Sequence, residues 1–214
     1  MPHTVLTCSL PAAHCAGSLR LRPPLNAPGY PLAVHGNRHR CVAGVLKIDT
    51  MRIRPAELSD APVLTVIRNW AADETVALFD DSHVTATDQA DWIASSQEQG
   101  FPIIVAENEA GTVVGYASCG TYRAYSGYRH TVENSVYVLP GNQGHGIGTA
   151  LLSAVLDHAR TNPAVFRVVA WIEAGNAASI ALHVKSGFTV KGTLSEAGWK
   201  FGRWLDVTVL ELAV

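Results

Sequence analysis

The chain has 214 residues, of which 48% are hydrophobic, and its formal net charge is −2 at pH 7. This length predicts one domain with room for a tail, and the small negative charge argues against a general affinity for nucleic acid. The sequence holds no run of 18 apolar residues, which argues against a membrane-spanning helix. We therefore expect neither nucleic acid nor a membrane as a partner.

Residues 1–50 differ in composition from the rest of the chain. They hold five of the 16 basic residues but one of the 18 acidic residues, together with six of the 11 prolines and three of the four cysteines. Scattered cysteines are typical of a reducing compartment, so we expect a cytoplasmic protein. Because Met51-Arg52-Ile53 resembles a natural beginning, we interpret residues 1–50 as a disordered extension or a start assigned too early, and residues 51–214 as the folded domain.

From Met51 onward the hydrophobic pattern predicts strands that alternate with helices. Helices are indicated by apolar residues at helical spacing, as in Ile147, Leu151 and Val155, and strands by short apolar runs. The expected helices cover residues 59–70, a segment from 87 through Ile93, 146–160 and 176–186. The expected strands cover 52–54, 102–106, 112–118, 132–138, 165–172, 188–193 and 203–212. This order indicates an α/β or α+β sheet domain with a hairpin near each end.

The most informative segment follows the strand at 132–138 and opens the helix at 146–160. It reads Gln143-Gly144-His145-Gly146-Ile147-Gly148. A helix start offers unpaired N–H groups at the positive end of the helix dipole, and glycines let a bulky anion reach them. The segment lacks the Lys of a P-loop and the G-x-G-x-x-G spacing of a dinucleotide fingerprint. By itself it predicts either a phosphate site of another kind or a plain flexible turn.

Three further motifs accompany this loop. They are Thr131-Val132-Glu133-Asn134-Ser135-Val136-Tyr137-Val138 before it, Asn176…Leu182-His183…Gly187-Phe188 after it, and Gly198-Trp199-Lys200-Phe201-Gly202-Arg203-Trp204-Leu205-Asp206 near the end. Together the four resemble the GNAT N-acetyltransferases, and in particular the phosphinothricin and methionine-sulfoximine acetyltransferase branch. The resemblance covers roughly residues 51–214. It implies a GNAT fold, in which helices flank a mixed, mostly antiparallel central sheet, with acetyl-CoA as co-substrate and no metal.

The resemblance also implies roles for individual residues. Glu133 stands at the position that this branch uses as the general base, although the residues alone favour a solvated carboxylate at the end of a strand. His183 replaces the usual Tyr and is predicted either to assist the departing thiolate or to pack locally. Predicted coenzyme A contacts are Val136, Tyr137, Val138, Gln143, Gly144, His145, Gly146, Ile147, Gly148, Thr149 and Asn176.

The substrate side is predicted from the segment 122–130 and from the loop near Phe79. Guanidinium groups bind carboxylates in bidentate fashion and aromatic rings shape a pocket, so these segments suit a small anionic amino acid. The expected substrate contacts are Phe79, Tyr122, Arg123, Tyr125 and Tyr128. Tyr125 stands where phosphinothricin enzymes tend to have a basic residue, which leaves other amino-acid analogues open.

We therefore predict an N-acetyltransferase that acts on the primary amine of a small amino acid or toxic analogue. The motifs of the domain contain no cysteine, which favours direct attack in a ternary complex over an acyl-cysteine. The alternatives are acetylation of a protein or peptide, and a non-catalytic acyl-CoA-binding module. The resemblance also allows a homodimer.

Overall fold

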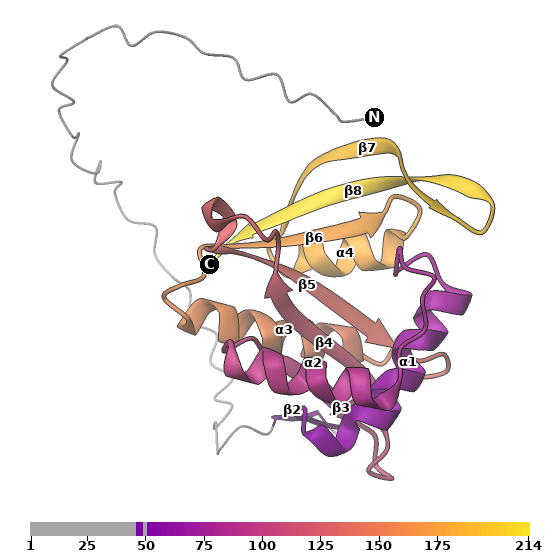
Figure 1. Cartoon of the computed structure of the whole chain (residues 1–214), viewed down its shortest axis with the longest axis vertical. Helices are drawn as coiled ribbons and strands as arrows, with labels where there is room; N and C mark the ends of the chain where they lie inside the picture. Colours follow the sequence, from indigo (N-terminus) through magenta and orange to yellow (C-terminus); the bar gives the residue numbers. More distant parts are fainter. Residues whose placement is uncertain (1–45, 49–50) are drawn as a thin grey trace, which may run out of the picture. The chain divides into compact units, whose positions relative to one another are not determined.

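The computed structural model describes residues 46–48 and 51–214, and Figure 1 shows their arrangement. These residues form one mixed sheet with helices on both faces. The strands are β1 (Leu46–Ile48), β2 (Met51–Pro55), β3 (Ile103–Glu107), β4 (Val113–Thr121), β5 (Thr131–Val138), β6 (Arg167–Glu173), β7 (Thr189–Lys200) and β8 (Arg203–Ala213). The helices are α1 (Ala61–Glu74), α2 (Ala86–Glu98), α3 (Ile147–Thr161) and α4 (Ala177–Lys185), with short 3₁₀ turns η1 (Leu58–Asp60) and η2 (Ser126–Tyr128).

The strand order in the sheet is β1-β2-β3-β4-β5-β6-β8-β7, and every neighbouring pair is antiparallel except β5 with β6. This confirms the predicted mixed, mostly antiparallel sheet and both predicted hairpins, β3–β4 and β7–β8. The parallel pair needs a crossover, and α3 supplies it between β5 and β6. The change of direction therefore falls in the middle of the sheet, directly beside the glycine loop.

Two apolar cores lie on opposite faces of the sheet. Helix α3 packs on one face with buried residues four apart, among them Leu151, Val155 and Ala159. On the other face, Leu64 and Ile67 of α1 and Ile93 of α2 are fully buried against β3, β4 and β5. Side chains alternate along β5, so its even-numbered residues belong to the α3 face and its odd-numbered residues to the α1–α2 face.

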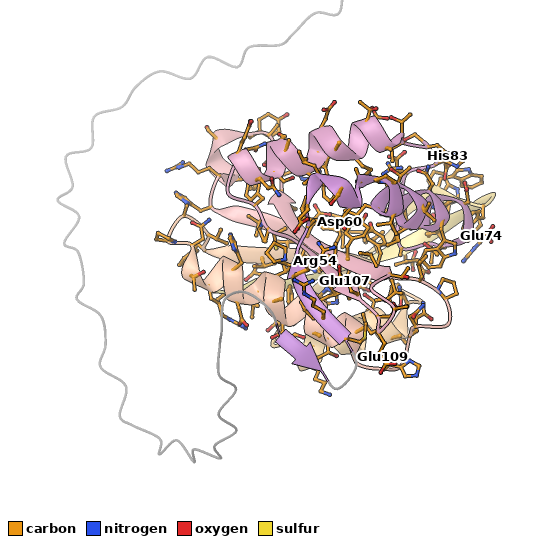
Figure 2. The ribbon with its side chains drawn as sticks, turned by 90° about the horizontal axis from the view of Figure 1, so that it is seen from below. Arg54, Asp60, Glu74, His83, Glu107 and Glu109 are labelled. Carbon is orange, nitrogen blue, oxygen red and sulfur yellow. The ribbon has the colours of Figure 1, made fainter. Side chains whose placement is uncertain are left out.

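An ion cluster away from the glycine loop joins β2, β3 and η1. The Arg54 guanidinium donates to both carboxylate oxygens of Asp60 at 2.7 and 2.8 Å and to Glu107 at 2.7 Å. Figure 2 shows these three side chains together beneath α1. Burial raises the pKa of Asp60, but the hydrogen bonds from Arg54 and from the Glu57 backbone N–H, together with the Arg54 charge, outweigh burial and lower the pKa overall. We read this cluster as structural, because it ties the start of the domain to the sheet.

Several predicted boundaries differ from the observed ones. Strand β1 falls within the segment assigned to the extension and pairs with β2. The remainder of the predicted extension lies outside the described residues. Helix α2 begins earlier than predicted because Thr85 and Asp88 form a reciprocal capping box, which places Asp88 at the third helical position. Strand β6 begins at Arg167, two residues later than predicted; the preceding Phe166 is exposed and its ring stacks on the Arg167 guanidinium.

Helix α1 continues one turn beyond the predicted end at Trp70, and β7 continues seven residues beyond the predicted end at Thr193. The extra length of β7 lies on the long hairpin with β8, whose register slips between Leu194 and Gly198. Within residues 46–48 and 51–214, none of the helices has the length and apolar character that crossing a membrane requires.

Candidate active site

The site is built on a gap in the middle of the sheet. Strands β5 and β6 pair only from Thr131 to Glu133 with Arg167 to Val169. Beyond these residues β5 stays paired to β4 and β6 stays paired to β8, so the two strands diverge. Every second residue of the free part of β5 turns its backbone N–H and C=O toward the gap. The gap can therefore receive an extended chain that carries amide groups.

A cavity of about 960 Å³ occupies this gap and reaches both faces of the sheet. Its walls come from β5, β6, α4, the segment between α1 and α2, and the β7–β8 hairpin. Among the residues that line it are Glu133, Asn134, Val136, Tyr137, Val138, Gln143, Gly148, Asn176 and His183, together with Phe79, Arg123, Trp171, Gly198 and Trp199. Six of the eleven predicted coenzyme A contacts thus line one cavity with the predicted base.

The start of α3, where Gly148 lines the wall, lies at one end of this cavity and is the predicted site for an anion. Its N-cap is Gly146, with φ of 79° and no side-chain cap, and Gly144 has φ of 80°. These left-handed conformations favour glycine, and an added Cβ at either position would meet open space. The first N–H groups of α3 are therefore left to an external partner, and their dipole favours a negative charge.

Of the other predicted contacts in this loop, besides Gly148, only Gln143 lines the cavity. Gly144, His145, Gly146, Ile147 and Thr149 are not among the residues that line the cavity. The Ile147 side chain is buried in the core, so this residue offers only its backbone N–H. Gln143 donates from its side chain to the Val138 carbonyl at 3.2 Å, which ties the loop back to the end of β5.

Glu133 marks the point at which β5 and β6 separate. It pairs with Gly120 on β4 and with Val169 on β6 and lines the cavity. Burial raises the pKa of Glu133, and the positive charge of Arg123 acts in the opposite direction. The Arg123 guanidinium lies over the Tyr122 ring at 5.0 Å and the Trp171 ring at 5.4 Å. A carboxylate and a stacked cation therefore face the same space.

His183 is buried and both of its ring nitrogens have partners. Nδ1 lies 2.8 Å from the Ser179 carbonyl oxygen, so it carries the proton and donates. Nε2 then accepts from the Asn134 side-chain amide at 2.9 Å. Burial lowers the pKa of His183, although the bond to Ser179 opposes this. This geometry favours the packing role of the two predicted for His183, because its one proton already has an acceptor.

The predicted substrate residues are only partly brought together. Phe79 and Arg123 line the cavity, whereas Tyr122, Tyr125 and Tyr128 are not among its lining residues. Tyr125 is 77% exposed on the surface. The Tyr122 and Tyr128 rings meet edge to face at 5.5 Å, which braces the segment that carries Arg123. These tyrosines thus shape the loop around Arg123 instead of facing the cavity.

Sequence reasoning missed several residues of the cavity, among them Trp171 and Asn134. Trp171 lies two positions beyond Val169, the partner of Glu133, so it projects to the same face as the predicted base. Asn134 is buried, and its carboxamide oxygen has no hydrogen-bond partner among the described residues. The adjacency of Asn134 to Glu133 was a usable signal, whereas the placement of Trp171 depends on the register of β6.

Comparison with known proteins agrees with this geometry. The model of the acetyltransferase (GNAT) family matches residues 64–188, which is more than half of the chain. The chain belongs to the GNAT family. The predicted family and fold are thereby confirmed.

Three relatives illustrate the match. An L-methionine sulfoximine/L-methionine sulfone acetyltransferase of Salmonella typhimurium is 45% identical over 162 residues, 76% of this chain and 94% of the relative. The solved yncA acetyltransferase of Salmonella typhimurium with its cofactor acetyl-CoA superposes with a TM-score of 0.74 at 44% identity, covering 77% of this chain and 94% of the other. A phosphinothricin acetyltransferase of Sinorhizobium meliloti in complex with acetyl-CoA gives 0.73 at 31% identity, with 77% and 89% covered.

These relatives agree with the predicted enzyme class and co-substrate. Two of them were solved with acetyl-CoA, the ligand predicted from the glycine loop. Of these three relatives, the two that are named by substrate act on small amino-acid analogues, which is the class predicted from the sequence.

Proposed function

We propose that this enzyme moves an acetyl group from acetyl-CoA to the primary amine of a small amino acid or toxic analogue, such as methionine sulfoximine, methionine sulfone or phosphinothricin. The observation that carries the proposal is the position of Glu133. Its carboxylate stands where the two central strands separate, in the cavity that also holds Arg123 and the start of α3. A base, a cation for a carboxylate and an anion site are thus aligned along one cavity.

The residues at the α3 end suit the pyrophosphate and pantetheine of coenzyme A. Gly144 and Gly146 leave open space above uncapped N–H groups, and the free backbone of Val136 to Val138 can pair with amides. Asn176 and Gln143 line the same stretch of the cavity. When bound, acetyl-CoA supplies a thioester carbonyl that an amine can attack.

Glu133 and Arg123 divide the work on the amine substrate. The stacked Arg123 guanidinium binds the α-carboxylate, which holds the neighbouring amine near Glu133. Glu133 takes the proton of the amine, and the burial that raises its pKa strengthens it as a base. The amine nitrogen then bonds to the acetyl carbon while the carbon–sulfur bond breaks. The sulfur leaves with the electron pair of that bond and takes up a proton to become a thiol.

Direct transfer is supported by the state of the cysteine in the described part of the chain. Cys119 lies buried in the core on β4, and burial raises the pKa of its thiol to about 12. A thiol with this pKa is almost entirely protonated at neutral pH and is a poor nucleophile. We therefore propose a ternary complex without an acetyl-cysteine, and a reducing, cytoplasmic setting suits this free thiol.

We propose a homodimer through the β7–β8 hairpin. This hairpin extends past the end of β6 in Figure 1. It exposes five large apolar side chains. They are Val190, Leu194, Trp199, Phe201 and Trp204, each about half exposed. A patch of this kind on a surface hairpin is typical of an interface. Light scattering should give the wild-type protein twice the mass of one chain. Trp204→Arg should reduce the measured mass to that of a single chain. A wild-type protein with the mass of one chain contradicts the proposal.

The decisive experiment for the activity is a substrate panel. Release of free thiol from acetyl-CoA is followed with phosphinothricin, methionine sulfoximine, methionine sulfone and the common amino acids, and a mixture of short peptides is tested by mass spectrometry. We expect turnover with at least one of the oxidised amino-acid analogues. Turnover with peptides alone indicates a protein acetyltransferase, and tight binding of coenzyme A without any turnover indicates a binding module.

A further inference from the structure

A buried lysine outside the proposed chemistry connects two distant parts of the chain. Lys200, the last residue of β7, has a side chain that is 1% exposed. Its ammonium donates to the Leu78 carbonyl at 2.5 Å and to the Ala71 carbonyl at 3.4 Å, and the Asp81 carboxylate lies 4.0 Å away. A buried ammonium is costly unless such partners surround it. The contacts of Lys200 therefore hold a specific arrangement of the chain between α1 and α2.

A second contact joins the same two parts. A methyl group added at Gly198 would overlap the Phe79 ring, so this ring rests directly on the backbone of β7. Gly198 does not have a positive φ, so the glycine is needed for space and not for its backbone conformation. Lys200 and Gly198 thus contact two successive residues, Leu78 and Phe79, from one end of the hairpin.

The contacted segment is a wall of the cavity. Residues 75–85 connect α1 to α2, and the members that line the cavity are Thr75, Ala77, Leu78, Phe79 and Asp80. The far part of the segment is held by α1 itself, since Arg68 donates to Asp80 at 2.5 Å and to the Ser82 carbonyl at 2.6 Å. The part that carries Leu78 and Phe79 is contacted from the hairpin. The position of this wall thus depends on β7 as well as on α1.

We propose that Lys200 and Gly198 are positioning residues that set the amine-binding side of the cavity by holding Leu78 and Phe79. The inference rests on the proposed function, in which Phe79 borders the amine substrate. The proposed coenzyme A contacts lie on β5, in the loop before α3, at the start of α3 and at Asn176, and the contacts of Lys200 and Gly198 described above involve none of these. We call the contacts of Lys200 with Leu78 and of Gly198 with Phe79 the clamp. Loss of the clamp therefore weakens the use of the amine and leaves the use of acetyl-CoA intact.

The first test is Lys200→Met, which keeps the length of the side chain and removes its charge and donors. A shift of the wall by about 1 Å is expected to raise KM for the amine roughly 10- to 100-fold, with KM for acetyl-CoA unchanged. Lys191→Met is the matched control, because Lys191 lies on the same strand with a side chain that is 48% exposed. Equal changes in both KM values, or an unchanged KM for the amine, overturn the inference.

The second test is a double-mutant cycle of Gly198→Ala and Phe79→Ala. Gly198→Ala forces the ring away and should lower kcat/KM for the amine about 10-fold or more. In the Phe79→Ala background the added methyl meets no ring, so Gly198→Ala should cause no further loss. A loss of the same size in both backgrounds contradicts the proposed contact.

Hydrogen exchange separates this inference from the proposed function. Lys200→Met should speed amide exchange in residues 75–85 and leave α3 unchanged, and this readout needs no substrate. If the wild-type enzyme acetylates no amine but the exchange changes as expected, the proposed function fails while the clamp itself stands. If the exchange of this segment stays at the wild-type rate, the clamp is refuted whatever the activity.

Discussion

Replacing Gly148 with alanine should separate the stability of the fold from the binding of coenzyme A. Gly148 is the second residue of α3 and has no positive φ, and a methyl group there would lie 3.4 Å from the Leu182 side chain, an ordinary contact. Alanine is favoured over glycine in helices by about 0.8–1 kcal/mol. The variant should therefore be as stable as the wild type, or gain about 1 kcal/mol, which raises Tm by about 2–4 °C.

The same substitution should weaken the binding of coenzyme A. Gly148 lines the cavity at the start of α3, where the pyrophosphate is proposed to meet uncapped N–H groups. A methyl group at this point keeps the anion from closing on them, and one lost hydrogen bond to a charged group costs about 1.5–3 kcal/mol. This corresponds to a roughly 10- to 100-fold rise in Kd for coenzyme A, measured by calorimetry beside a thermal melt.

Gly141→Ala is the control for this experiment. Gly141 has φ of 81°, an added Cβ would meet open space, and the residue is not among those that line the cavity. Its substitution should cost about 1–2 kcal/mol of stability through the left-handed backbone and leave Kd unchanged. Wild-type affinity in Gly148→Ala would refute the placement of the pyrophosphate at the start of α3.

Three further predictions concern the titrating side chains. Glu133→Gln should lower kcat about 10²- to 10⁴-fold with the affinity for coenzyme A unchanged, and an unchanged kcat in steady-state assays removes Glu133 as the base. Because the Arg123 charge lowers the pKa of Glu133, Arg123→Met should raise it, and the acidic limb of the kcat/KM profile should move to higher pH; a limb that stays in place contradicts this coupling. Burial lowers the pKa of His183 below 6.5, so the unfolded chain binds this proton more readily and stability falls as the pH drops below that value. His183→Gln should reduce this loss between pH 7.5 and 5 in urea unfolding, and an equal loss in both proteins speaks against it.

The glycine loop and the helix that follows it were predictable because their signals are local. A strand, a run of glycines and an amphipathic helix follow one another within residues 132–160, and the structure shows the uncapped helix start that this order predicts. The buried spacing of α3 was equally clear from the sequence. Boundaries were less predictable where a capping pair decided them, as at Thr85 and Asp88.

The contacts between distant segments could not be predicted in the same way. The register of β6 against β5 decides that Trp171 projects toward the Glu133 face, and the packing of α4 decides that Asn134 meets His183. The segment 122–130 contributed Arg123 to the cavity, while its tyrosines went to the surface or to each other. Which side chain of a polar loop faces a cavity depends on the path of that loop, and short-range patterns do not encode it.

The sequence by itself determined the GNAT fold, the glycine loop where an anion site is predicted, and Glu133 as the candidate base. Each of these depends on residues adjacent in the chain or on motifs in a fixed order. The tertiary structure alone decided the hydrogen bond between His183 and Asn134, the stacking of Arg123 on Trp171 and the contact of Lys200 with Leu78. These depend on pairs 48 to 122 positions apart. Such contacts form only after the chain between the two residues has folded. A pattern of neighbouring residues therefore does not indicate which distant residues will pair.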